Sequence, residues 1–146
     1  MRATTPETPT KLQLLELLAA IGTAQWRDFA VAAAHHGLTS TQAKVLAQLN
    51  GPLPMRALAT LLVCDASNVT GIVDRLEARG LVRREPDPSD RRVKNVIATD
   101  EGRDVIRRVR EEMQTTHGAL DTLDADDSAT LYSLLARLRP GMEKDA

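Results

Sequence analysis

Apolar residues recur at helical spacing over the first quarter of the chain. From Lys11 to about His35 they lie three and four positions apart, and Leu14 and Leu17 widen the apolar surface beyond one stripe. A long helix of this kind needs a covering surface beyond its local core. We interpret that surface as a subunit interface, and packing within one subunit is the alternative. The spaced positions are Leu12, Leu15, Leu18, Ile21, Trp26, Phe29 and Ala33.

Three shorter helices are predicted next from capping signals. Gly37 closes the first helix, and a capping box formed by Thr39 and Gln42 starts a second helix that reaches about Leu49. After a turn at residues 50–53, Pro54 suits the first position of a third helix, where no N–H is needed. A fourth helix is predicted between Asp65, which caps its start, and Gly80, which ends it. Apolar residues that recur every three or four positions form its inward face, namely Val69, Ile72, Val73 and Leu76.

The period then changes from helical to strand-like. Residues 81–85 and 93–98 are rich in β-branched side chains and flank a polar, proline-containing loop at residues 86–91, which predicts a β-hairpin. Thr99 caps a fifth helix, and Asp124 caps a sixth. We expect this last helix to stop at the residues Pro140 and Gly141. The expected fold is mostly α with a small β-hairpin wing, the layout of a winged helix-turn-helix.

Composition bounds the class of protein. The 146 residues are 42% hydrophobic and 27% charged, which fits one globular domain, and no apolar run approaches the roughly 20 residues of a membrane span. Residues 1–10 lack the apolar stretch of a secretion signal, so we expect a flexible tail and a cytoplasmic protein. Cys64 is the only cysteine, which excludes an internal disulfide and a multi-cysteine zinc site. We expect no metal and no cofactor.

Charge is unevenly distributed, although the formal net charge is only −1. The region from Arg75 to Lys94 is basic, whereas residues 121–127 are acidic without a basic residue. Only three aromatic residues are present, so stacking platforms for single-stranded nucleic acid are missing and duplex DNA is the better candidate partner. The basic residues of the region are Arg75, Arg79, Arg83, Arg84, Arg91, Arg92 and Lys94.

The outward side of the fourth helix carries groups suited to reading bases. Asn68 can pair with adenine through two hydrogen bonds, and Arg75 can reach guanine or a phosphate. An ordinary solvated helix face is the alternative, but the basic hairpin that follows supplies the phosphate contacts that a recognition helix needs. The outward residues are Ser67, Asn68, Thr70, Gly71, Asp74 and Arg75.

The hairpin loop offers a candidate probe for the minor groove. Asp90 and Arg92 stand two positions apart, so the carboxylate can hold the guanidinium in one rotamer and reduce the entropy lost on insertion. A surface ion pair worth less than about 1 kcal/mol is the alternative.

Three segments give the chain a specific resemblance. Residues 38–46, 65–82 and 87–102 resemble the MarR family of transcriptional regulators, with an Asp-x-Arg pair in the wing and a Thr-x-x-Gly helix start after it. Val63 and Ala98 depart from the family pattern, at positions where glycine and leucine are common. The resemblance implies DNA contacts from Ser67, Asn68, Thr70, Gly71 and Arg75 in the recognition helix and from Asp90, Arg91 and Arg92 in the wing.

The resemblance also implies an organisation and a mode of action. Residues 11–146 would form one domain, with dimerisation helices at 11–36 and 100–140 and a DNA-binding lobe at 39–99. The implied function is that of a homodimeric repressor that binds a pseudo-palindromic operator. A small aromatic or anionic effector would release the repressor from this DNA.

Effector binding implicates residues at the end of the first helix. Trp26, Phe29 and His36 lie near the crevice in which relatives bind small molecules, although core packing and helix termination are the alternatives for them. Redox sensing through Cys64 is another alternative, but its place in the turn before the recognition helix suggests packing.

Two further classes of function have less support in the sequence. The three histidines lack metal-ligand spacing, and neither a phosphate loop nor a nucleophile motif occurs, so we expect no enzyme. A winged helix used only for protein contacts is the remaining alternative, and it predicts no salt-dependent affinity for DNA.

Overall fold

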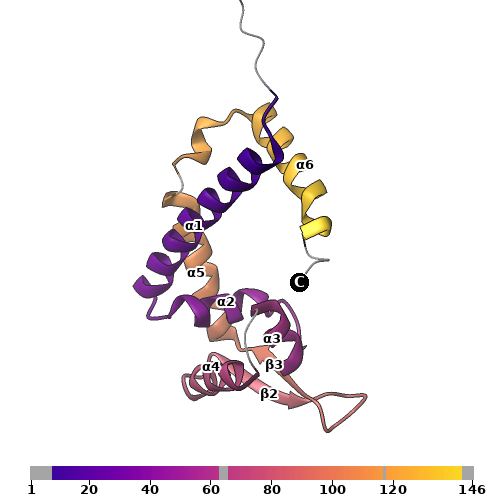
Figure 1. Ribbon diagram of the computed structural model, residues 1–146. Coiled ribbons are helices and arrows are strands. Elements are labelled where there is room, and N and C mark those ends of the chain that lie inside the picture. Colours follow the sequence, from indigo (N-terminus) through magenta and orange to yellow (C-terminus); the bar gives the residue numbers. More distant parts are fainter. Residues whose placement is uncertain (1–7, 63–65, 117, 143–146) are drawn as a thin grey trace, which may run out of the picture. The chain divides into compact units, whose positions relative to one another are not determined.

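The computed structural model describes residues 8–62, 66–116 and 118–142 and confirms a mostly helical fold with a small antiparallel sheet. Val63, Cys64 and Asp65, the predicted turn and cap before the fourth helix, lie outside the described residues. In chain order the elements are α1 (Lys11–His35), α2 (Ser40–Gln48), β1 (Leu53–Pro54), α3 (Met55–Leu62), α4 (Ala66–Ala78), β2 (Val82–Pro86), β3 (Lys94–Ala98), α5 (Asp100–Thr116), the 3-10 helix η1 (Leu120–Thr122) and α6 (Ala125–Met142) (Figure 1).

The chain divides into two compact units, residues 1–113 and 114–146. The first unit contains the described helices α1 to α4, the sheet and most of α5, and it holds the hydrophobic core. The second contains the end of α5, η1 and α6.

Capping explains where the first two helices begin. The Thr39 side chain accepts a hydrogen bond from the Gln42 N–H at 3.1 Å, and the Gln42 side chain accepts one from the Thr39 N–H at 3.0 Å, as predicted. Thr10 and Gln13 form the same arrangement before α1, in addition to the predicted caps. Gly37 follows α1 with a positive φ of 72°, a conformation that glycine adopts without strain.

The prediction that Pro54 starts a helix is wrong. Leu53 and Pro54 form the short strand β1, and the helix starts at Met55. Leu53 pairs with Val96 of β3 in a sheet of strand order β1-β3-β2. Because β1 is an edge strand, proline's missing N–H removes no hydrogen bond from the centre of the sheet.

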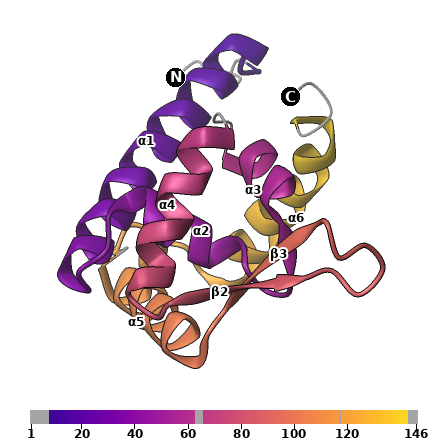
Figure 2. The ribbon, with the colours of Figure 1, turned by 90° about the horizontal axis from the view of Figure 1, so that it is seen from below.

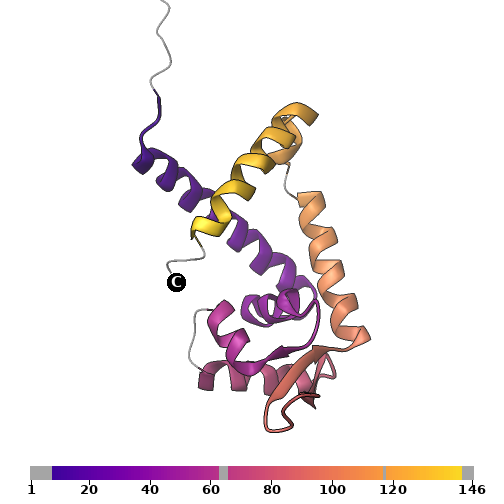
Figure 3. The ribbon, with the colours of Figure 1, turned by 90° about the vertical axis from the view of Figure 1, so that its right-hand side faces the viewer.

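The predicted hairpin is confirmed, although each strand starts one residue later than expected, at Val82 and at Lys94. Val82 pairs with Ala98 and Pro86 with Lys94, so β2 and β3 are antiparallel along their whole length. The loop between them projects past the helices of the first unit (Figure 1, Figure 3).

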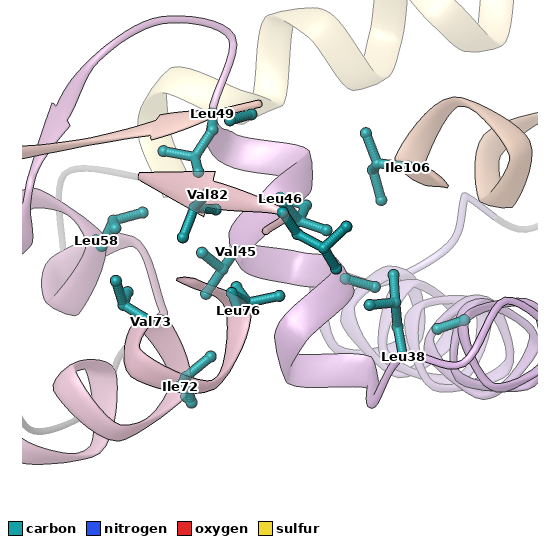
Figure 4. Close-up of a cluster of buried hydrophobic side chains, with 14 of the residues drawn as sticks. Leu38, Val45, Leu46, Leu49, Leu58, Ile72, Val73, Leu76, Val82 and Ile106 are labelled. Atoms are coloured by element: carbon teal, nitrogen blue, oxygen red, sulfur yellow. The ribbon is translucent and has the colours of Figure 1, made fainter. Parts of the chain in front are cut away.

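The core confirms the inward face predicted for α4. Val69, Val73 and Leu76 are completely buried and Ile72 is 7% exposed. They pack with apolar residues of α2, α3, the sheet and α5 (Figure 4). The largest of the fully buried side chains in this core are Val45, Leu46, Leu58, Val69, Val73, Leu76, Val82, Val96 and Val109.

A close backbone contact fixes the start of α5. The Thr99 side chain accepts a hydrogen bond from the Gly102 N–H at 3.1 Å, which confirms the predicted cap, and donates one to the Gly80 carbonyl at 2.6 Å. The Thr99 N–H donates to the Leu81 carbonyl at 3.0 Å. A Cβ atom at Gly102 would lie 2.0 Å from that carbonyl oxygen, so only glycine fits there. This contact gives the Thr-x-x-Gly pattern its physical reason.

The start of α6 is as predicted, and its end is not. The Asp124 carboxylate accepts a hydrogen bond from the Asp127 N–H at 2.8 Å. The helix continues through Pro140 and Gly141 to Met142, so the prediction that these two residues stop it is wrong. A proline loses its own N–H bond and disfavours helix at the residue before it, but it leaves later residues free to donate to the turn already formed.

Large apolar side chains are exposed on two helices. In α1 the exposed fraction of the leucines and isoleucine named below ranges from 45% to 64%, and in α6 the four leucines range from 38% to 48%. No helix in the described ranges combines the length and hydropathy required to span a bilayer. The residues are Leu12, Leu14, Leu15, Leu17 and Ile21 in α1, and Leu131, Leu134, Leu135 and Leu138 in α6.

Candidate nucleic-acid interface

The polar face of α4 is open to solvent. Asn68, Thr70 and Arg75 are exposed, and Gly71 is partly exposed between them. Ser67 belongs to the first turn of α4, but its side chain lies outside the described part of the structure. Figure 2 shows α4 and the hairpin on the same face of the first unit. The exposed groups of α4 therefore share a surface with the hairpin loop.

Four of the seven basic residues between positions 75 and 94 bind groups of the protein itself. Arg79 donates to the Gly37 carbonyl at 2.7 Å and so ties the end of α4 to the turn between α1 and α2. Arg83 pairs with Glu85 on the same strand. Arg84 and Arg92 pair with carboxylates described below. Within the described ranges, the structure shows no ion pair for Arg75, Arg91 or Lys94, which leaves these exposed cations for a partner.

Arg84 of β2 joins the hairpin to α4. Its guanidinium pairs with Asp74 at 2.5 Å and with Glu77, and its backbone N–H donates to Glu77 at 3.1 Å. Burial lowers the pKa of Arg84, but hydrogen bonds to Asp74 and Glu77 outweigh it, so the pKa is raised above its usual value. The network neutralises two carboxylates beside the polar face of α4. Asp74 was expected to face outward, and its pairing with Arg84 could not be foreseen from its position in the helix.

Replacing Arg84 with alanine is expected to lower DNA affinity about tenfold or more. Asp74 and Glu77 would lose their cation and repel phosphates, and α4 would lose its link to β2. Fluorescence anisotropy with a duplex ligand measures the loss. If repulsion is the cause, the triple variant R84A, D74N and E77Q recovers part of the affinity, whereas no recovery would assign the loss to the broken link alone.

At the hairpin tip, the predicted contact between Asp90 and Arg92 is present. Arg92 Nε lies 3.2 Å from Asp90 Oδ1, and the Arg92 N–H donates to the same oxygen at 3.1 Å. The Arg92 side chain is 92% exposed, so the ion pair orients it without covering it. Arg91 beside it is also exposed.

Asp87 holds the loop in one conformation. Its carboxylate accepts hydrogen bonds from the Ser89 hydroxyl at 2.5 Å, the Ser89 N–H at 2.8 Å and the Asn95 side chain at 2.8 Å. The Ser89 hydroxyl is the largest cause, followed by Asn95, of a pKa for Asp87 well below its usual value. A carboxyl whose pKa is lowered in the folded protein stabilises the fold fully above its unfolded pKa, and this contribution is lost progressively as the pH falls from the unfolded pKa through the folded one. The loop therefore keeps its support at neutral pH.

The candidate effector residues fall in two places. The Trp26 and Phe29 rings lie 5.6 Å apart, Phe29 is buried, and Lys44 Nζ lies 5.4 Å from the Trp26 ring centre. Trp26 lines a cavity of about 220 Å³ with Thr41, Lys44, Leu62 and Asn68. His36 is not among the residues that line this cavity.

His36 instead contacts α5. His36 Nε2 lies 2.9 Å from one oxygen of Glu112, and His35 Nδ1 lies 2.5 Å from the other. The hydrogen bond with His35 is the largest cause of a lowered pKa for Glu112. No group of three metal-binding side chains occurs within the described ranges.

Comparisons with known proteins place these features among transcriptional regulators. The MarR family profile matches residues 38–94. The chain is 33% identical over 107 residues to the multiple antibiotic resistance protein MarR of Salmonella typhimurium (strain LT2). This alignment covers 70% of this chain and 74% of that protein. It spans only 49% to 59% of the length of four other curated helix-turn-helix regulators.

Solved structures are similar over most of their length. CouR from Rhodococcus jostii RHA1, solved with p-coumaroyl-CoA bound, is 30% identical with a TM-score of 0.72, covering 87% of this chain and 89% of that one. The apo form of MarR from E. coli is 26% identical with a TM-score of 0.74, covering 90% and 98%.

Proposed function

This chain belongs to the MarR family of transcriptional regulators and carries the family's DNA-binding winged helix-turn-helix, and from that premise we propose that it is a homodimeric repressor. It binds a pseudo-palindromic operator and is released by a small aromatic or anionic effector. A dimer seated on an operator excludes other proteins from the same DNA, which is the physical basis of repression.

One observation carries the proposal: α4, whose polar face is exposed, lies on the same face of the first unit as the hairpin (Figure 2), and the loop of that hairpin carries the exposed guanidinium of Arg92. We assign the major groove to α4, where Asn68 reads a base edge and Gly71 lets the backbone come close. Arg92 enters the minor groove, oriented by Asp90. The full set of assigned DNA contacts is Ser67, Asn68, Thr70, Gly71, Arg75, Asp90, Arg91 and Arg92.

The exposed leucines of α1 and α6 support the homodimer. Several large apolar side chains exposed along one helix are typical of an interface, and the N-terminal helix α1 and the C-terminal helix α6 each expose such side chains. The bound p-coumaroyl-CoA of CouR supports control by a small molecule.

Selection of bound duplexes from a random pool, followed by footprinting, tests the function. We expect two inverted half-sites about 10 base pairs apart and an affinity that falls log-linearly with salt. Sedimentation should give a dimer. A footprint over a single half-site together with a monomer in solution would contradict the homodimer, and indifference to every duplex at low salt would contradict DNA binding.

Replacing Asn68 with alanine is expected to relax the preference at one base position in each half-site. The amide can make two hydrogen bonds to an adenine, and their loss costs about 1–3 kcal/mol of discrimination against the wrong base. Binding to a panel of single-base operator variants measures this. Equal loss on every variant would instead make Asn68 a backbone contact.

A further inference from the structure

One side of α4 faces the hairpin, and the other faces the α1 and α2 helices. Glu77 pairs with Arg84 of β2, which marks the hairpin side. Arg79, directly after α4, donates to the carbonyl of Gly37 between α1 and α2, which marks the opposite side. Figure 2 shows α1 and the hairpin loop on opposite sides of α4. Because a major groove is bounded by two phosphate strands, a helix that lies in it can be held by cations on both of its sides.

Lys44 of α2 lies on the side of α4 that faces α1. It lines the cavity of about 220 Å³ that Asn68 and Trp26 also line. Asn68 is exposed and Lys44 is partly exposed. Arg75 is seven residues after Asn68, which is two helical turns, so it lies along the same side of α4. Within the described ranges Lys44 forms no ion pair with a carboxylate, and its positive charge is therefore available beside Asn68.

The indole ring of Trp26 orients the Lys44 ammonium. Lys44 Nζ lies 5.4 Å from the ring centre, and a cation within roughly 6 Å of a ring centre is attracted to the aromatic face. The Trp26 ring itself lies 5.6 Å from the ring of Phe29, which is buried in the core. An aromatic face orients the ammonium without offering it the negative charge of a carboxylate. Less side-chain entropy is then lost when Lys44 contacts an anion.

We propose that Lys44 binds a backbone phosphate next to the base that Asn68 reads, on the side of α4 opposite the hairpin. The contact positions the first turn of α4 in the major groove without reading sequence. Trp26 is a positioning residue that acts through Lys44, a role different from the effector contact expected from the sequence. This inference rests on the proposed function, since it adds a DNA contact outside the recognition helix and the wing.

The salt dependence of operator binding tests the charge of Lys44. K44Q should lower the affinity at low salt tenfold or more and reduce the slope of log K against log salt by roughly two, because each subunit of the dimer then neutralises one phosphate fewer. K44R should keep the slope and most of the affinity. K11Q is the matched control, since it removes the same charge from α1 about 20 Å along the helix axis from Trp26. An unchanged slope in a folded K44Q, or an equal fall in K11Q, would overturn the proposal.

Base preference separates a phosphate contact from an indirect effect on Asn68. K44Q should weaken binding to every single-base operator variant by the same factor, whereas N68A relaxes the preference at one base. A relaxed preference in K44Q at the base read by Asn68 would mean that Lys44 only positions Asn68, and the phosphate contact would be wrong.

Duplexes with a single neutral methylphosphonate locate the contact. In each half-site the wild-type protein should lose affinity when the phosphate beside the base read by Asn68 is replaced. K44Q should lose none at that position, because the charge that this phosphate attracts is already missing. The same profile of losses in the wild-type protein and in K44Q would refute the contact.

Variants of Trp26 test the role of the ring. W26L should lower operator affinity about threefold in the protein that has Lys44, and it should leave the affinity of K44Q unchanged. Losses of equal size in both backgrounds would refute the orientation of Lys44 by the ring. Circular dichroism shows whether W26L is folded. Should it unfold, W26F replaces it, because phenylalanine keeps a weaker aromatic face and should give a smaller loss that also depends on Lys44.

Binding by the wild-type protein separates this inference from the proposed function. If the wild-type protein binds its operator and K44Q keeps the same affinity and slope, the inference alone is refuted. If the wild-type protein binds no duplex at low salt, the proposed function is refuted together with the contact at Lys44.

Discussion

Replacing Arg92 with alanine should weaken binding to every duplex and reduce the salt dependence of binding. The Arg92 guanidinium is 92% exposed, and its ion pair with Asp90 orients it. Its insertion into the minor groove displaces counterions. Because a dimer carries two copies, the slope of log K against log salt should fall by roughly two, with roughly a hundredfold loss of affinity at low salt.

Arg108 provides the control for this experiment. It is 58% exposed and paired with a carboxylate, as Arg92 is, but it lies on α5 away from the hairpin loop. R108A should leave the slope unchanged. D90A should cost less than R92A, because the cation remains and only its orientation is lost. An unchanged slope in R92A would remove Arg92 from any groove or phosphate contact.

Replacing Gly102 with alanine should give the largest loss of stability among single-methyl changes. The added Cβ would lie 2.0 Å from the Leu81 carbonyl oxygen and 3.3 Å from Leu46 Cδ2, so α5 has to move away from the sheet. Overpacking of this kind costs about 3 kcal/mol, which corresponds to a fall in Tm of roughly 10 °C. Thermal unfolding followed by circular dichroism at a fixed protein concentration measures it.

Gly71 is the matched control, since it is also a helical glycine and a Cβ added there would have no atom within 4 Å beyond its own helical turn. G71A should keep or slightly raise the Tm, because alanine favours a helix by about 1 kcal/mol. A Tm for G102A equal to that of G71A would show that the contact with Leu81 is easily relieved.

The elements with a strong period were predictable, and the exceptions have physical reasons. The buried residues of α4 recur every three or four positions, with exposed polar residues between them, so its inward face could be assigned from the sequence. β1 has two residues, too few for any alternation to show. The end of α6 could not be predicted from proline alone, because the rest of a long helix can offset the cost of one proline.

The same distinction holds for the site. Asp90 and Arg92 are two residues apart, so their contact could be predicted from spacing. The carboxylate partners of Arg84 and the Asn95 partner of Asp87 are seven to ten residues away, and they meet only through the register of the hairpin and the packing of α4 on β2. Such pairs cannot be distinguished in the sequence from other neighbouring charges. The cavity lined by Trp26, Lys44 and Asn68 is formed by residues of elements that lie far apart in the sequence, so no local sequence pattern predicts it.

The attachment of Arg84 to α4 limits how this protein can acquire a new operator. Within the described ranges Asn68 and Arg75 make no ion pair with β2, whereas Asp74 and Glu77 are shared between the recognition helix and β2. A specificity library that randomises the whole outward face of α4 would therefore mostly yield variants in which the wing is no longer anchored. Libraries that hold Asp74 and Glu77 constant should return a far larger fraction of working regulators.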